Sequence, residues 1–153
     1  MSNSNPEEIY SDTVREVLES MAFVFTDPVD ASELAPGPGP FFKVSMHYTG
    51  PQKGCLGLAA PVSLAIEMGA NMLGADESED TGLAADALKE LLNIICGQFL
   101  TRYYGETPIF DLSVPLIQEI ERAEWGNLAT TEGALLLEAD ESQIIASYSV
   151  EPA

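Results

Sequence analysis

The longest stretch of helical periodicity covers residues 81–105, with the sequence TGLAADALKELLNIICGQFLTRYYG. At about 100° per residue, one side of this helix is an ordinary apolar core face. That face consists of Ala84, Leu88, Leu91, Ile95 and Phe99. On the opposite side, Asp86, Glu90, Asn93 and Gly97 fall at about 0°, 40°, −20° and 20°. These four residues form what we name the polar stripe, and the apolar residues expected beside it are Leu83, Ile94, Cys96 and Leu100. The pattern predicts an apolar helix with one narrow polar line on which a partner's surface could lie.

The first half of the chain predicts two further helices and a strand pair. Residues 11–23 show helical spacing, with Ser11 or Asp12 as the expected cap. Residues 41–49 and 55–61 show strand-like composition around the turn sequence GPQKG. Pro61 is expected at the start of a short amphipathic helix that ends at Gly74, and Asp80 or Thr81 is expected to cap the long helix.

The last third of the chain reads as strands. Residues 109–120 contain Pro115, which restricts this strand to a sheet edge or a bulge. The sequence ERAEWGN favours a turn of helix, and residues 133–139 and 143–151 predict a hairpin. This order of elements predicts an α+β domain in which an antiparallel or mixed sheet is packed against helices.

Length and composition are those of one globular domain covering residues 1–153. Residues 26–40 contain the sequence PGPGP, which predicts a surface loop. No apolar run approaches the roughly 20 residues that a membrane span needs. The polar, acidic start MSNSNPEEIY does not resemble a signal peptide, so we expect a cytoplasmic protein.

The net charge of −19 comes from 25 acidic and 6 basic residues. It argues against binding nucleic acid or an anionic membrane surface, both of which require a basic patch. It permits a partner that carries a basic patch, although a scatter of solvated acids would explain it equally.

The residues that usually carry chemistry are sparse. The single histidine, His47, lies in a predicted strand and is interpreted as a strand residue rather than a catalytic base. Cys55 and Cys96 are interpreted as buried free thiols. No metal-site spacing, nucleophile elbow or phosphate loop is present, so we expect no cofactor or metal of the chain's own.

The polar stripe is what remains. Glu90 can pair with a lysine or arginine, and the Asn93 amide both donates and accepts, so it can orient a water molecule. Orienting a water for attack on a group presented by another molecule is one interpretation. The alternative is a stripe that is simply solvated or that caps a neighbouring loop.

The spacing Asp86-x3-Glu90-x2-Asn93, followed by Pro115, resembles the signature of the CheC/CheX/FliY phosphatases of bacterial chemotaxis. The helix sequence ADALKELLNIICG is similar to CheX in particular. The segments VREVLESMA, GCLGL, LAIEMGANMLG and FDLSVP also resemble CheX elements, so the similarity covers most of the chain outside the PGPGP loop.

Two features depart from the family pattern. The interval between Asn93 and Pro115 is one residue shorter than the family's, which a one-residue loop deletion explains. CheC-type members carry two such motifs, whereas here Glu67 is followed at the third position by Ala70, and Asn71 comes one residue late. One residue is about 100° of helix rotation, so that amide leaves the stripe and one site remains, as in CheX.

The resemblance implies a phosphatase that acts on the phosphorylated aspartate of a CheY-type response regulator. In that mechanism Glu90 pairs with the regulator's active-site lysine and Asn93 aligns the attacking water. Asp86 and Gly97 belong to the partner-binding surface, and Pro115 is a structural residue of the motif. The regulator supplies Mg²⁺, and the family implies a homodimer joined through the sheets. The alternatives are a non-catalytic CheX-like module that binds a receiver domain or a flagellar-switch protein, and a plain structural subunit.

Overall fold

The computed structural model describes residues 5–35, 37–73, 81–139 and 141–153. Its helices are α1 (Pro6–Ala22), α2 (Val62–Leu73), α3 (Thr81–Tyr104) and α4 (Arg122–Ala129), with a short 3₁₀ helix at Ala31–Glu33. Its strands are β1 (Asp27–Val29), β2 (Phe41–Thr49), β3 (Gly54–Pro61), β4 (Asp111–Leu112), β5 (Leu116–Ile120), β6 (Ala134–Ala139) and β7 (Ser142–Val150). The predicted α+β fold class is therefore confirmed.

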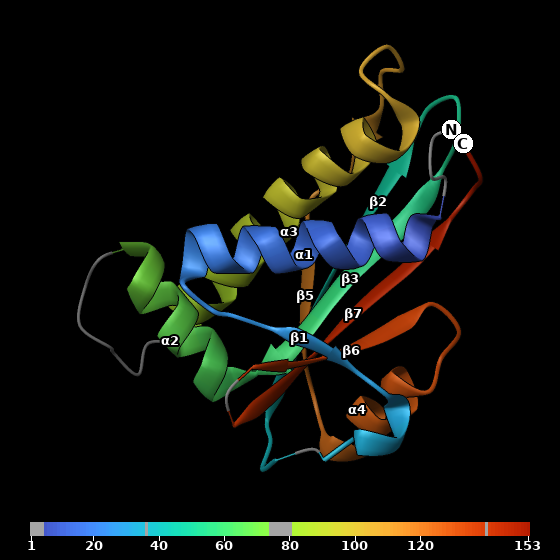
Figure 1. Ribbon diagram of the computed structural model, residues 1–153. Helices are drawn as coiled ribbons and strands as arrows, with labels where there is room; N and C mark the ends of the chain where they lie inside the picture. The colour runs from blue at the N-terminus through green and yellow to red at the C-terminus, as the bar shows by residue number, and fades with distance from the viewer. Residues whose placement is uncertain (1–4, 36, 74–80, 140) are drawn as a thin grey trace.

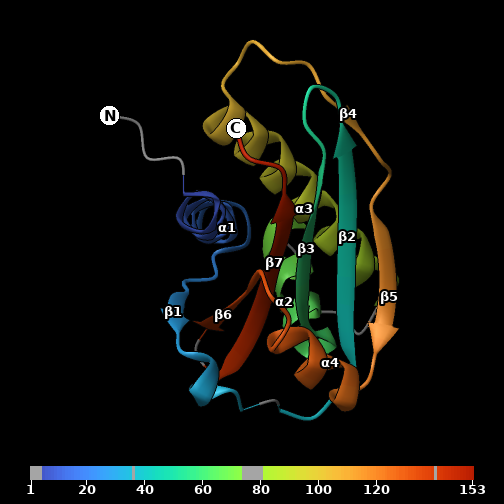
Figure 2. The same cartoon turned by 90° about the vertical axis from the view of Figure 1, so that its right-hand side faces the viewer.

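All described strands join one antiparallel sheet in the order β1-β6-β7-β3-β2-β4, and β5 also pairs with β2. Figures 1 and 2 show α1, α2 and α3 stacked on one face of this sheet and α4 on the other. The larger core lies between the three helices and the sheet. A smaller core lies under α4, where Trp125 stacks on Phe41 with ring centroids 4.4 Å apart. The helix predicted from ERAEWGN is thus a real, two-turn element that closes part of the second face.

Helix α1 begins earlier than its hydrophobic spacing predicted. Asn5, rather than Ser11 or Asp12, is its N-cap, and the Asn5 side chain accepts a hydrogen bond from the Glu7 amide. Pro6 occupies the first helical position, where its missing N–H costs nothing. The predicted start was wrong because Tyr10, one turn before Val14, is fully buried and extends the apolar period, and Ile9 packs against the same core.

Residues 26–40 were expected to form a loop, but part of this segment is a strand and a 3₁₀ helix. Residues 27–29 form β1, which pairs with β6 in the register Asp27↔Glu138 to Val29↔Leu136. A 3₁₀ turn follows, and its backbone is held from outside because the Glu33 carbonyl accepts from the Gln143 side chain at 2.8 Å. Such a short edge strand depends on its partner for its hydrogen bonds, and three residues are too few to show the alternation of polar and apolar positions that would predict a strand.

The segment around Pro115 lies at the edge of the sheet and is bulged, as its proline predicted, because residues 113–115 interrupt the pairing with β2 between β4 and β5. Ser113 still donates its amide to the His47 carbonyl, whereas Leu116 lies opposite Ser45. Val114 and Pro115 therefore share the place opposite one residue of β2, which is the geometry of a β-bulge. Pro61 is the last residue of β3 and directly precedes α2, which begins at Val62, so the predicted junction of strand and helix is confirmed. Gly74 and Asp80, the expected stop and cap, lie outside the described residues.

Candidate functional site

The candidate site lies on α3, the longest helix of the described chain. Its inner face is buried as predicted, because Ala84, Leu88, Leu91, Ile95 and Phe99 are all at most 1% exposed. The helix ends where Gly105 adopts a left-handed φ of 94° and donates its amide to the Thr101 carbonyl. Burial of one face therefore fixes the rotation of α3, and with it the direction in which the opposite face points.

All four residues of the polar stripe are solvent-exposed, as the helical spacing predicted. Glu90 and Asn93 have no hydrogen-bond or ion-pair partner in the part of the chain that the structure describes. A β-carbon built on Gly97 would meet no heavy atom within 4 Å. A carboxylate, an amide and an open backbone position thus lie in line on an accessible helix surface.

Asp86 differs from the other stripe residues because it has a partner within its own helix. Its Oδ1 atom lies 3.8 Å from Nζ of Lys89, three residues along. An exposed pair of this kind contributes little stability, roughly 0.3–0.5 kcal/mol. Lys89 places a cation beside Glu90, and the i,i+3 spacing of Asp86 and Lys89 could have indicated the pair from the sequence.

Fewer apolar residues border the polar stripe than the sequence predicted. Leu83 is 44% exposed and Ile94 is half-buried, so these two border the stripe. Cys96 and Leu100 were expected beside it as well, but both are buried in the main core. The difference arises because α1 and α2 both pack against α3, so the buried arc is wider than one sheet contact would produce.

Contacts at the last turns of α3 hold the helix in place. The Arg102 guanidinium donates to Thr13 Oγ1 at 3.2 Å and to Glu16 Oε1 at 2.8 Å, which ties α3 to α1. The Tyr104 hydroxyl is hydrogen-bonded to Tyr48 Oη of β2 at 2.6 Å. Side chains on a rigid, anchored helix keep their position when a partner docks, which is what a positioning role requires.

Helix α2 carries no second copy of the stripe. Glu67 is exposed, but the amide one residue out of step, Asn71, donates to the Ala22 carbonyl at 2.8 Å. Its amide therefore joins α2 to the end of α1. The prediction of a single site agrees with this geometry, although the functional roles of Glu90, Asn93, Asp86, Gly97 and Pro115 stay predictions.

The remaining reactive side chains lie apart from the stripe's exposed surface. Among the described residues, no three His, Cys, Asp or Glu side chains are grouped to hold a metal ion. His47 is an exposed residue of β2. Burial, with a smaller effect of Cys55, raises the pKa of the Cys96 thiol to about 12, so this thiol is protonated at neutral pH. Cys55 is free but only half-buried, which corrects the expectation that both thiols are buried.

No described helix is both long and apolar enough to cross a membrane. No curated protein matches the chain. Solved structures do match along nearly its whole length. A chemotaxis protein CheX from Desulfovibrio desulfuricans is 18% identical with a TM-score of 0.70, covering 95% of this chain and 99% of its own. CheX from Vibrio vulnificus is 17% identical with a TM-score of 0.71, covering 99% and 100%.

A third similar structure is the CheX–CheY–BeF3–Mg²⁺ complex of Borrelia burgdorferi. It is 20% identical with a TM-score of 0.69, and the match covers 97% of this chain and 99% of that one. At these identities the structures establish the fold. The family model described as chemotaxis phosphatase CheX matches residues 42–127, which is more than half of the sequence and includes α3 and Pro115. The chain therefore belongs to the CheX family of chemotaxis phosphatases.

Proposed function

We propose that this chain is a protein-aspartyl-phosphate phosphatase that acts on a CheY-type response regulator. The observation that carries the proposal is the pair Glu90 and Asn93, exposed and without partners among the described residues, on the anchored helix of a CheX family member. The structure of a relative with CheY, BeF3 and Mg²⁺ supports a receiver domain as the partner. Such a partner would place the chain in the cytoplasm.

The chemistry of the Glu90 and Asn93 side chains suggests a different role for each. The Glu90 carboxylate accepts hydrogen bonds and pairs with a lysine on the regulator, which holds the complex together. The Asn93 amide can donate to one group and accept from a water, so it aligns that water with the phosphorus atom. The regulator supplies the phosphoaspartate and Mg²⁺, so the chain itself needs no metal ligand for this reaction.

A phosphate-release assay on a phosphorylated receiver domain of the same organism tests both roles. Asn93→Ala should lower kcat on the order of 100-fold with little change in KM, because a misplaced water costs about that much. Glu90→Ala should mainly raise KM, by about tenfold or more, because a charge-assisted contact is lost. Asn127→Ala and Glu106→Ala remove the same groups from exposed positions on α4 and in the loop after α3 and should behave as wild type. A wild-type rate for Asn93→Ala would refute the mechanism.

A second candidate function is binding without hydrolysis. The interval between Asn93 and Pro115 is one residue shorter than the family pattern, and Pro115 lies in the bulge of the strand next to β2. A shift there would alter how the edge strand supports the site. Tight binding of the phosphorylated receiver with no faster loss of phosphate would select this alternative.

We also propose a homodimer joined through the sheets, in keeping with the family. The strand beside β2 ends the sheet on one side and is bordered by the exposed apolar residues Val114 and Leu116. Light scattering of wild type and of Leu116→Glu at the same concentration tests this surface. An unchanged dimer mass in the variant would exclude that edge, and a monomeric wild type would exclude the dimer.

A further inference from the structure

A groove lies between α1 and the strands β1 and β6. It consists of two pockets of about 380 Å³ and about 540 Å³. Asp12 and Arg15 line both pockets, so the two are parts of one surface, which we name the α1 groove. None of the residues that line it belongs to α3, so the α1 groove is separate from the polar stripe.

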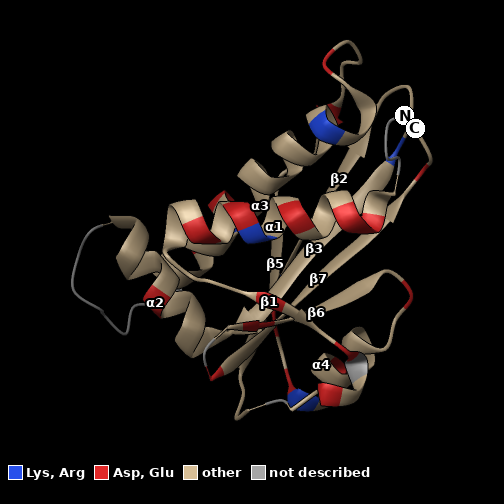
Figure 3. Ribbon diagram, in the orientation of Figure 1, with Lys and Arg blue, Asp and Glu red and all other residues tan. Residues whose placement is uncertain are grey.

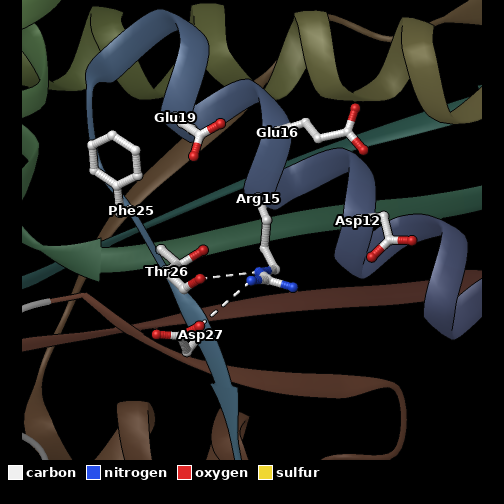
Figure 4. Close-up of a pocket in the computed structure, with 7 residues that line it drawn as sticks. All are labelled: Asp12, Arg15, Glu16, Glu19, Phe25, Thr26 and Asp27. Atoms are coloured by element: carbon white, nitrogen blue, oxygen red, sulfur yellow. Dashed lines mark hydrogen bonds and ion pairs between the residues drawn. The ribbon is translucent and has the colours of Figure 1, made fainter.

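The helix side of the groove is acidic. Asp12, Glu16 and Glu19 are spaced at i, i+4 and i+7, which aligns them along one side of α1. Figure 3 shows acidic residues along this helix, and Figure 4 shows Asp12, Glu16 and Glu19 spread along α1 while the Arg15 guanidinium points toward Thr26 and Asp27. In the described structure, Asp12 and Glu19 have no ion-pair partner, whereas Glu16 binds Arg102.

Arg15 does not neutralise this surface. Its Nε donates to the Thr26 carbonyl at 3.1 Å, and its guanidinium lies 3.6 Å from Oδ1 of Asp27. With Asp27 included, the first pocket has four carboxylates against the guanidinium groups of Arg15 and of Arg102, which binds Glu16, so a formal charge of −2 remains. Negative charge therefore remains available for a cation brought by another molecule.

A buried hydroxyl without a partner gives independent evidence for a ligand. Thr26 lines the first pocket and is only 7% exposed, yet its Oγ1 has no hydrogen-bond partner among the described residues. Figure 4 shows the Thr26 side chain on the same side as Arg15. An unpaired buried hydroxyl is unfavourable, so an incoming donor that bonds to it would gain more than it would from an exposed group.

Part of the lining is apolar, beside the polar Asn5, Glu7, Glu8 and Ser11 of the second pocket. Phe25 borders the first pocket and is 68% exposed, and a ring face of this kind suits a guanidinium. The second pocket is lined by Pro28 and Val29 of β1 and by Leu135 of β6. A small cation would make no use of this apolar surface. A protein segment with basic side chains separated by apolar ones would use both sides of the groove.

We propose that the α1 groove binds a basic, apolar-spaced segment of a partner protein, with an arginine or lysine between Glu19, Asp27 and Thr26. Asp12 holds a second cation of that segment, and its apolar side chains lie on Val29 and Leu135. The strongly negative groove would repel an anionic membrane surface, which argues against a lipid occupant.

Titration of the isotope-labelled full chain, followed by amide NMR shifts, tests the proposal. The probe is a short amidated peptide that alternates arginine and leucine. Two matched peptides replace leucine by glycine or arginine by glutamate. The expected result is tightest binding of the arginine–leucine peptide, with amide shifts concentrated in residues 12–29 and 134–136. Asp12→Asn combined with Glu19→Gln should weaken that binding about tenfold or more.

Because the chain has a net charge of −19, general attraction must be separated from the groove. Glu106→Gln combined with Glu119→Gln removes the same charge from exposed positions elsewhere and should change the affinity less than about twofold. Thr26→Val keeps the shape and removes the unpaired hydroxyl, so it should raise the melting temperature while weakening binding about tenfold. Equal losses in both double variants, equal binding of the arginine–glycine peptide, or unchanged affinity of Thr26→Val would each overturn the proposal.

Discussion

Replacing Gly97 by alanine should change stability and activity in opposite directions. Gly97 lies inside α3, where its backbone is helical and a β-carbon would meet no atom of the described chain within 4 Å. Glycine in a helix interior is less favourable than alanine by about 0.5–1 kcal/mol. Nothing in the folded chain offsets that gain, so the free energy of unfolding should rise by about this amount.

For a domain of this length, about 1 kcal/mol corresponds to about 2–4 °C in melting temperature. Gly97→Ala should therefore melt about 1–4 °C higher than wild type. The same methyl group lies one turn from Asn93 on the surface that we propose meets the regulator. An error of about 1 Å in positioning can cost about 100-fold in rate, so a fall of about tenfold or more in kcat/KM is expected.

The assay pairs a thermal melt with phosphate release from the receiver domain. Gly126→Ala is the matched control, because Gly126 also lies in a helix and a β-carbon there also meets nothing within 4 Å. It lies on α4, on the other face of the sheet, so it should gain similar stability and keep full activity. If Gly97→Ala and Gly126→Ala are equally active, the glycine is not reserved for the partner's approach, and that part of the reasoning fails.

Three further changes test the fold. Burial raises the pKa of the Cys96 thiol to about 12, so its contribution to stability is intact below about pH 9, where the unfolded thiol titrates, and is lost as the pH rises toward 12. In urea titrations the free energy of unfolding of Cys96→Ala should therefore fall less steeply over that pH range than that of wild type. A thiol reagent at pH 8 should modify Cys55 before Cys96. Phe23→Gly should raise the free energy of unfolding by about 1 kcal/mol, because Phe23 holds a left-handed φ of 55° while largely exposed; a lower melting temperature would contradict this. Tyr10→Phe should cost about 1–3 kcal/mol in chemical denaturation, since its buried hydroxyl donates to the Gly57 carbonyl at 2.7 Å, and an unchanged midpoint would show that the bond contributes nothing.

Several parts of the molecule could be predicted from the sequence because their signals are local. The buried face of α3 and the exposure of Asp86, Glu90, Asn93 and Gly97 follow from a period of 3.6 residues. Pro115 predicted an edge or a bulge because it lacks an amide hydrogen, and the segment around it has both features. The out-of-step Asn71 was recognised as leaving the stripe by the same helical geometry.

Other features depended on contacts between distant segments. The three residues of β1 are a strand only because β6 supplies their hydrogen bonds, more than a hundred residues later. Cys96 and Leu100 are buried because α1 and α2 both pack on α3, and helical periodicity alone does not show how many neighbours a helix has. The α1 groove requires α1, β1 and β6 to be side by side, so no single stretch of sequence contains its pattern. The sequence by itself thus determined which residues share the polar stripe, since helix geometry is local. Only the tertiary structure decided which surfaces remain open beside it, because burial depends on what packs against each face.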